Sequence, residues 1–217
     1  MTAIGWWRAR VPARAGEAAR LVFVHSDDRP DGTEIVVEPD WIEPQQTIGA
    51  VLLGEHGAPT DIAVRAGVRP DTPPLWYAEL RELTGRPPAV SMLAFSGAGV
   101  APGRLLDRTA AGNVDVTTDD QLAAIRWYPA TGEIDQIYVA PHARRRGIAT
   151  VLLHAAGMLS VANGWGRLWS DGQRTMLGEH LRNSRDWQHR AADLTHIAPP
   201  MTPGEAASPE VSRSPSR

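Results

Sequence analysis

The residues from Ile134 to Thr150 restrict the fold more than any other part of this sequence. An apolar strand pattern ends in Val139, a proline follows at position 141, and then come three consecutive arginines and a glycine. From Gly147 to Asn163 the residues favour a long helix. The predicted buried stripe of this helix consists of Ile148, Leu152, Ala155, Ala156 and Leu159. The segment therefore predicts a strand, a tight basic loop and a helix in direct succession.

This order of elements suits an anion. The first turn of a helix offers main-chain N–H groups without partners and a partial positive charge. Gly147 lacks a side chain where an anion would have to approach the main chain closely. The arginines at positions 144 to 146 add fixed positive charge. Together these features predict a site for a diphosphate group.

The segment resembles the acetyl-CoA-binding motif of the GNAT superfamily of acyl-CoA-dependent N-acyltransferases. In that motif Gln or Arg is followed by two residues, Gly, one residue, and Gly or Ala, and here Arg144, Gly147 and Ala149 occupy those positions. The preceding strand with its proline and the later Leu152-Leu153 pair also match. The close resemblance covers about 35 residues. A looser resemblance extends from about Gln121 to Asn183.

The resemblance implies an α+β (α/β/α) fold. Its central sheet is mixed but mostly antiparallel, contains a splayed strand pair and is flanked by helices, with an extended N-terminal region before it. We expect residues 1–197 to form one GNAT-like domain with its motif core at 121–183. Residues 198–217 are rich in Ser and Pro and poor in apolar residues, and they are predicted to be a disordered tail.

The resemblance also implies how a cofactor would be held. Main-chain groups near Ile137 and Val139 would pair with the pantetheine arm, and amides from about Arg145 to Thr150 would hold the pyrophosphate. The implied acetyl-CoA contacts are Ile137, Tyr138, Val139, Arg144, Arg145, Arg146, Gly147, Ile148, Ala149 and Thr150. A neutral amine would attack the thioester directly, and a main-chain N–H near Tyr138 or Val139 would stabilise the oxyanion.

Two carboxylates are candidates for the base that removes the amine proton. Glu133 and Asp135 lie two apart on the strand that enters the motif, so alternation predicts that they share a face. The alternative is that Glu133 belongs to a hairpin turn and Asp135 to a solvated edge. Many relatives protonate the leaving thiolate with a tyrosine in the last helix, but Thr175–Trp187 contains none. Tyr138 is the nearest tyrosine in the sequence, while His180 and His189 are other candidates.

The rest of the chain gives weaker signals. The first third predicts a meander of short strands, including Leu21–Val24, Thr33–Glu38 and Thr47–Leu53. Thr72-Pro73-Pro74 favours the start of a helix that would place Trp76, Leu80 and Leu83 on one face. Residues 86–113 read as mostly loop, with short strands near Val90–Phe95. Further strands are expected at Leu122–Tyr128, Glu133–Val139 and Arg167–Ser170, and a helix at Thr175–Asn183. The usual last strands of the family have no clear counterpart.

Composition excludes several chemistries. The chain has no cysteine, so thiolate catalysis, disulfides and Cys-based metal sites are absent, and no metal site is expected. All 22 basic residues are arginine, so no lysine can act as a base or be acylated. No stretch reaches the roughly 20 apolar residues of a membrane span. These observations favour a cytoplasmic protein that does not enter a membrane.

The acceptor is not defined by the sequence. A small-molecule or peptide amine is the expected acceptor, since a net charge of −3 argues against nucleic acid as a partner. Two alternatives stay open: a GNAT-like transferase of phage type that modifies a DNA nucleobase, and a non-catalytic protein that keeps the fold and binds CoA or a partner. Acetyl or a longer acyl group, and a monomer or a homodimer, are equally compatible with the sequence.

Overall fold

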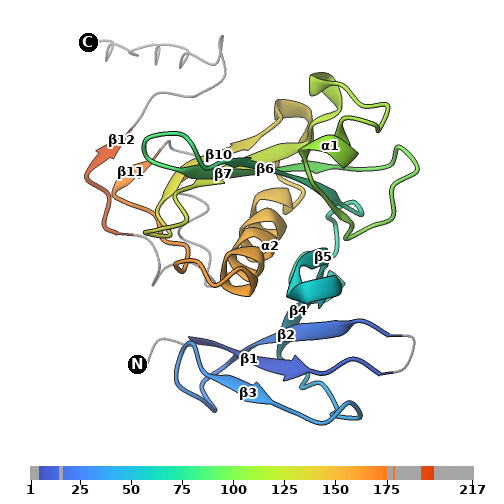
Figure 1. The fold of residues 1–217 in the computed structure, drawn as a ribbon. Coiled ribbons are helices and arrows are strands. Elements are labelled where there is room, and N and C mark those ends of the chain that lie inside the picture. Colours follow the sequence, from blue (N-terminus) through green and yellow to red (C-terminus); the bar gives the residue numbers. More distant parts are fainter. Residues whose placement is uncertain (1–4, 15–16, 175–177, 179–191, 198–217) are drawn as a thin grey trace, which may run out of the picture.

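The computed structural model describes residues 5–14, 17–174, 178 and 192–197. These residues form three layers, in which the long helix α2 (Ile148–Ala162) lies between two five-stranded sheets. Figure 1 shows the N-terminal sheet on one side of α2 and the second sheet on the other. One continuous hydrophobic cluster contains buried residues from both sheets and from the helix.

The N-terminal sheet has the strand order β3-β1-β2-β4-β5. Its strands are β1 (Gly5–Val11), β2 (Ala19–Ser26), β3 (Glu34–Val36), β4 (Thr47–Leu53) and β5 (Pro59–Val64). Neighbours pair antiparallel except for β1 and β3, which are parallel. Short 3₁₀ turns at Glu55–Gly57 and Ala66–Val68 flank β5. The predicted short strands are confirmed, but they do not form a simple meander, because β3 pairs with β1 and β4 pairs with β2.

The second sheet has the order β10-β9-β7-β6-β8. Its strands are β6 (Trp76–Glu82), β7 (Ala89–Phe95), β8 (Leu105–Leu106), β9 (Ala123–Trp127) and β10 (Ile134–Val139). Only the β6–β8 pair is parallel. The short helix α1 (Arg108–Ala111), capped by the Asp107 side chain, and a 3₁₀ turn at Thr118–Asp120 lie between β8 and β9. This mixed, mostly antiparallel sheet confirms the expected α+β class, but the described layers are sheet, helix and sheet, and not one central sheet flanked by helices.

The helix expected after Thr72 is wrong, because residues 76–82 form strand β6. Its side chains alternate between two clusters: Tyr77 joins the core beneath the sheet, whereas Trp76 and Ala78 pack on the opposite face. Pairing with β7 along the whole strand supplies partners that an isolated helix would lack. Leu83, which the helix would have buried, is 55% exposed. The neighbouring β7 confirms the strand expected near Val90–Phe95.

Helix α2 is buried almost all round. Twelve of its 15 residues are buried, including the predicted stripe. The reason is its position, since side chains of the N-terminal sheet pack on one flank and those of β9 and β10 on the other. Trp6 approaches the position where Gly157 would carry a Cβ to within 3.2 Å. A mostly apolar helix that is buried on nearly every side is therefore stable only while both sheets cover it.

Little of the chain beyond α2 is described. The expected strand Arg167–Ser170 is reduced to a parallel bridge between Glu133 and Trp169. Two short strands, β11 (Gln173–Arg174) and β12 (His196–Ile197), pair in parallel. The predicted helix Thr175–Asn183, apart from Gly178, together with His180, His189 and the tail 198–217, lies outside the described residues. Within the described ranges, no helix has the length and apolarity needed to cross a bilayer.

Candidate active site

Strand β10 is the edge of the second sheet, and most of its outer edge has no strand partner among the described residues; this unpaired edge is called the notch below. At the start of the strand the Ile134 N–H donates to the Trp169 carbonyl at 2.8 Å, and the Trp169 N–H donates to the Gly132 carbonyl at 3.0 Å. Beyond Ile134, no main-chain group of the described residues pairs with this outer edge. The two segments thus meet at one end and then separate, which is the splayed pair expected from the sequence.

Alternation along β10 determines which main-chain groups face the notch. The Ala140 N–H donates to the Leu122 carbonyl on the β9 side at 2.9 Å. Residues two apart direct their main-chain groups to the same side, so Tyr138 faces β9, and Ile137 and Val139 face the notch. The Val139 carbonyl accepts a hydrogen bond from Arg144 Nε at 3.0 Å, in agreement with this direction.

A β-bulge interrupts β10 at Asp135. Ile134 lies opposite Trp127 and Gln136 lies opposite Arg126, so Asp135 has no residue opposite it. Glu133 and Asp135 nevertheless lie on one face of the sheet, as expected, because Glu133 is paired with Tyr128 and the Tyr128 hydroxyl reaches Asp135. Sequence pattern alone gave no signal of the extra residue.

The bulge places the Asp135 carboxylate in a polar network. It accepts a hydrogen bond from the Tyr128 hydroxyl at 2.9 Å and pairs with Arg126 Nε at 3.1 Å. Arg126 also bonds Glu82 at 2.7 Å. The hydrogen bond to Asp135 raises the pKa of Tyr128, and the bond to Glu82 raises the pKa of Arg126. Asp135 is therefore already engaged by a cation and a hydroxyl.

Glu133 occupies the point where the notch begins. Its main chain pairs with Tyr128 on one side, where the Tyr128 N–H donates to the Glu133 carbonyl at 2.9 Å, and with Trp169 on the other. Residues paired in this way carry their side chains on the same face of a sheet. Glu133 is half-buried, and its carboxylate forms no ion pair with any residue that the structure describes.

The basic loop after β10 forms a main-chain nest. After a 3₁₀ turn at Pro141–Ala143, Arg145 and Gly147 adopt positive φ angles of 64° and 75°. The first hydrogen bond of α2 runs from the Val151 N–H to the Gly147 carbonyl, at 3.1 Å. The N–H groups of residues 148 to 150 have no acceptor among the described residues, and no side chain caps the helix. Such a nest binds anions.

Gly147 is required by its conformation and by its neighbours. A Cβ at this position would lie 2.8 Å from the Cβ and Cγ of Arg69 and 2.9 Å from the Thr72 hydroxyl. The turn that contains Arg69 and Thr72 therefore packs directly on the nest. This contact joins segments far apart in the sequence, and sequence reasoning missed it.

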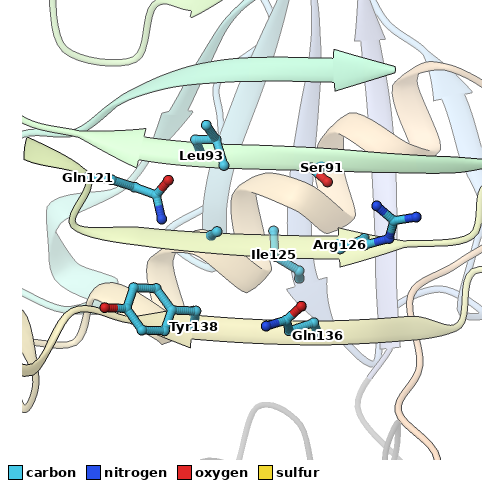
Figure 2. Close-up of a pocket in the computed structure, with 8 residues that line it drawn as sticks. Ser91, Leu93, Gln121, Ile125, Arg126, Gln136 and Tyr138 are labelled. Carbon is cyan, nitrogen blue, oxygen red and sulfur yellow. The ribbon is translucent and has the colours of Figure 1, made fainter. Parts of the chain in front are cut away.

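A pocket of about 270 Å³ lies on the face of the second sheet that is turned away from α2. Figure 2 shows Gln121 and Tyr138 close to one end of it and Arg126 and Gln136 toward the other. It is lined by Ser91, Leu93, Gln121, Ala124, Ile125, Arg126, Gln136 and Tyr138. Helix α1 and its neighbours cover the β6 end of this face, leaving the pocket over β7, β9 and β10. Of these residues, the sequence singled out only Tyr138.

The edge strand of this sheet separates from its neighbour and is followed by a main-chain nest at the start of a helix. This arrangement is typical of a site of the acyltransferase class. The comparisons with known proteins agree: the model of the acetyltransferase (GNAT) family matches residues 70–173 of the chain. Acyl transfer is the reaction of the family. Neither a characterised protein nor a solved structure matched the chain. The matched segment includes the second sheet and α2 but not the N-terminal sheet.

Proposed function

We propose that the protein is an N-acetyltransferase, which transfers the acetyl group of acetyl-CoA to a primary amine by direct attack of the amine on the thioester. The observation that carries this proposal is the open outer edge of β10, which leads straight into the nest at residues 144–150. The open edge suits the amides of a pantetheine arm, and the nest suits a diphosphate. Both fit one extended ligand.

The main chain of β10 would serve two roles. The Ile137 and Val139 groups that face the notch would pair with the pantetheine arm, as an added strand would. Of the two candidate oxyanion donors, alternation favours the Val139 N–H, since the Tyr138 N–H is directed toward β9. The donor lies on the part of β10 after the bulge, which pairs regularly with β9, so it would be oriented before the substrates bind.

Glu133 is the preferred base of the two carboxylates. It lies where the notch begins and has no ion-pair partner among the described residues, whereas Asp135 is paired with Arg126. A carboxylate that no cation engages has its oxygens available to bond the amine or a water molecule. It would take the amine proton directly or through one water molecule. The pocket walled by Gln136 and Tyr138 would receive the acceptor, a small molecule or a peptide.

The first experiment measures binding of acetyl-CoA by calorimetry and by the shift in melting temperature. Replacing Arg145 and Arg146 with alanine should weaken binding by about tenfold or more, because both exposed guanidinium groups flank the nest. The matched control replaces Arg86 and Arg108, two exposed arginines far from the nest in sequence, with alanine. This control changes the net charge equally and should leave binding unchanged. Equal losses in both variants, or no binding by the natural protein, would contradict the proposal.

The second experiment identifies the reaction. Release of free thiol from acetyl-CoA is followed in the presence of a panel of amines that includes diamines, amino sugars and short peptides. Turnover with at least one amine is expected, and an acetylated product should appear in equal amount. Binding of acetyl-CoA without turnover on any acceptor would instead support a non-catalytic protein, and turnover on duplex DNA alone would support the nucleobase alternative.

A further inference from the structure

A hydroxyl from outside the motif holds the nest. Thr72 Oγ1 donates a hydrogen bond to the Arg146 carbonyl at 2.7 Å, although the two residues are 74 positions apart. The sequence pattern favoured Thr72 as a helix cap, but no helix follows it. Its hydroxyl instead contacts the residue directly before Gly147. The Thr72 side chain therefore contacts the basic loop and does not cap a helix.

The basic loop needs such support because its conformation is unfavourable. Arg145 has a φ of 64°, a left-handed conformation that is unfavourable for a residue with a Cβ. Conformations of this kind persist only where surrounding contacts enforce them. Without them, Arg145 would return to an ordinary negative φ and the N–H groups of the nest would no longer converge.

Three contacts enforce the loop. Arg144 Nε bonds the Val139 carbonyl at 3.0 Å and fixes the start of the loop to β10. The stem of Arg69 packs against Gly147. The Thr72 hydroxyl bonds the Arg146 carbonyl, and the Thr72 N–H donates to the Arg69 carbonyl at 3.2 Å, which closes the turn that presents both side chains. Of the three contacts, only the Thr72 hydrogen bond is made to the peptide group between Arg146 and Gly147, through its carbonyl oxygen.

We propose that Thr72 is a positioning residue for the diphosphate site, and that its hydroxyl orients the Arg146–Gly147 peptide. In a trans peptide the carbonyl and the N–H point in opposite directions. When Thr72 binds the carbonyl, the Gly147 N–H is directed away from the turn at 69–72, into the nest with the first amides of α2. The identity of the ligand in this inference rests on the proposed function. The geometry of the nest does not depend on that function.

The test replaces Thr72 with valine, which keeps the shape and removes the hydroxyl, and with serine, which keeps the hydroxyl. Thr72→Val should weaken the binding of acetyl-CoA by about five- to tenfold, the usual effect of losing one hydrogen bond that orients a site. Thr72→Ser should bind within about twofold of the natural protein, since the bond to Arg146 is retained. The matched control is Thr33→Val, because the Thr33 hydroxyl also donates to a main-chain carbonyl, that of Pro30, at 2.7 Å.

A second readout does not depend on the ligand. Hydrogen exchange at the Val151 amide, which bonds the Gly147 carbonyl at 3.1 Å, should accelerate in Thr72→Val and remain unchanged in Thr33→Val and Thr72→Ser. Natural-like exchange at this amide in Thr72→Val would overturn the inference, as would equal losses of acetyl-CoA affinity in the Thr72 and Thr33 variants. If the natural protein itself does not bind acetyl-CoA, the proposed function fails, while the exchange measurement still decides whether Thr72 holds the nest.

Discussion

The two sheets of this protein have similar strand arrangements, but they differ in how fully their faces and edges are covered. Each has five strands, mostly antiparallel, with one short parallel edge strand, and each contributes to the cluster around α2. The N-terminal sheet is covered on its other face by a second apolar cluster. The second sheet leaves part of its other face open as a pocket and leaves the outer edge of β10 without a strand partner in the described region.

This difference distinguishes the N-terminal sheet, which packs on α2, from the second sheet, which carries the candidate site. Unpaired main-chain groups on an edge strand are usually a liability, because they invite another strand to pair. At β10 they lie beside a nest and a pocket, where a ligand could satisfy them. The N-terminal sheet, with its faces covered, contributes packing instead. The following four predictions test this division, from the largest expected effect to the smallest.

The largest effect is expected from α2, because both sheets depend on it. Leu152 is fully buried, and Leu152→Ala should lower the free energy of unfolding by about 2–5 kcal/mol. Chemical denaturation measures the loss, and hydrogen exchange should accelerate to a similar extent in β2 and in β9. Leu83→Ala, at a position 55% exposed, is the control and should change stability by less than about 0.5 kcal/mol. Acceleration confined to one sheet would show that the sheets do not share a core.

The next effect concerns the acyl-transfer reaction and separates the two carboxylates of β10. Glu133→Gln should lower kcat by about a hundredfold, within the range for loss of a general base. Asp135→Asn should lower it by less than about tenfold, since Asp135 acts in a network with Arg126 and Tyr128. Steady-state assays over a range of pH compare the two variants. A larger loss in Asp135→Asn would reverse the assignment of the base.

A smaller effect is expected where the N-terminal sheet meets the notch. Arg167, two residues before Trp169, pairs with Asp31 and donates a hydrogen bond to the Trp6 carbonyl at 3.2 Å. Both charged side chains are partly exposed, so Arg167→Met and Asp31→Asn should each cost only about 1 kcal/mol. A double-mutant cycle should show that the costs do not add. Simple additivity would mean that this ion pair does not link the two regions.

The smallest effect is spectroscopic. The hydrogen bond to Asp135 raises the pKa of Tyr128, and burial raises the pKa of Tyr77 beyond the range of an ordinary tyrosine. The stabilisation from a raised pKa is fully present below the unfolded value of about 10 and is lost as the pH rises through the folded value. Ultraviolet titration should therefore show delayed ionisation of Tyr128 in the natural protein. In Asp135→Asn this ionisation should move back toward pH 10, and an unchanged titration would contradict the network.

The sequence predicted the local features of the site well. The order of strand, arginines, Gly147 and helix depends on near neighbours, and the helix expected from Gly147 to Asn163 differs from α2 by one residue at each end. The family match over residues 70–173 confirms the resemblance drawn from this motif. The largely apolar composition of α2, which has no charged residue, could also have indicated cover on every side, because a surface helix would keep a polar face.

Features that depend on distant pairing could not be read from the sequence. The residues of β6 carry a helix-like spacing of apolar side chains, and only their pairing with β7 makes them a strand. The bulge at Asp135 arises from the register with β9 and has no signature in β10 alone. The contact between Thr72 and Arg146 spans 74 residues, so no local rule anticipates it.

The shared helix has a consequence for the architecture of the chain. A fragment limited to residues 70–173 would retain α2 but expose the hydrocarbon flank that Trp6, Phe23 and Ile62 now cover. In water that exposed apolar flank would drive the fragment to self-associate, and the first turn of α2, which forms the nest, would not reach its folded conformation. The N-terminal sheet, which the family model does not match, thus buries one side of α2, which the model does match. It therefore could not be replaced by an unrelated domain without exposing the helix.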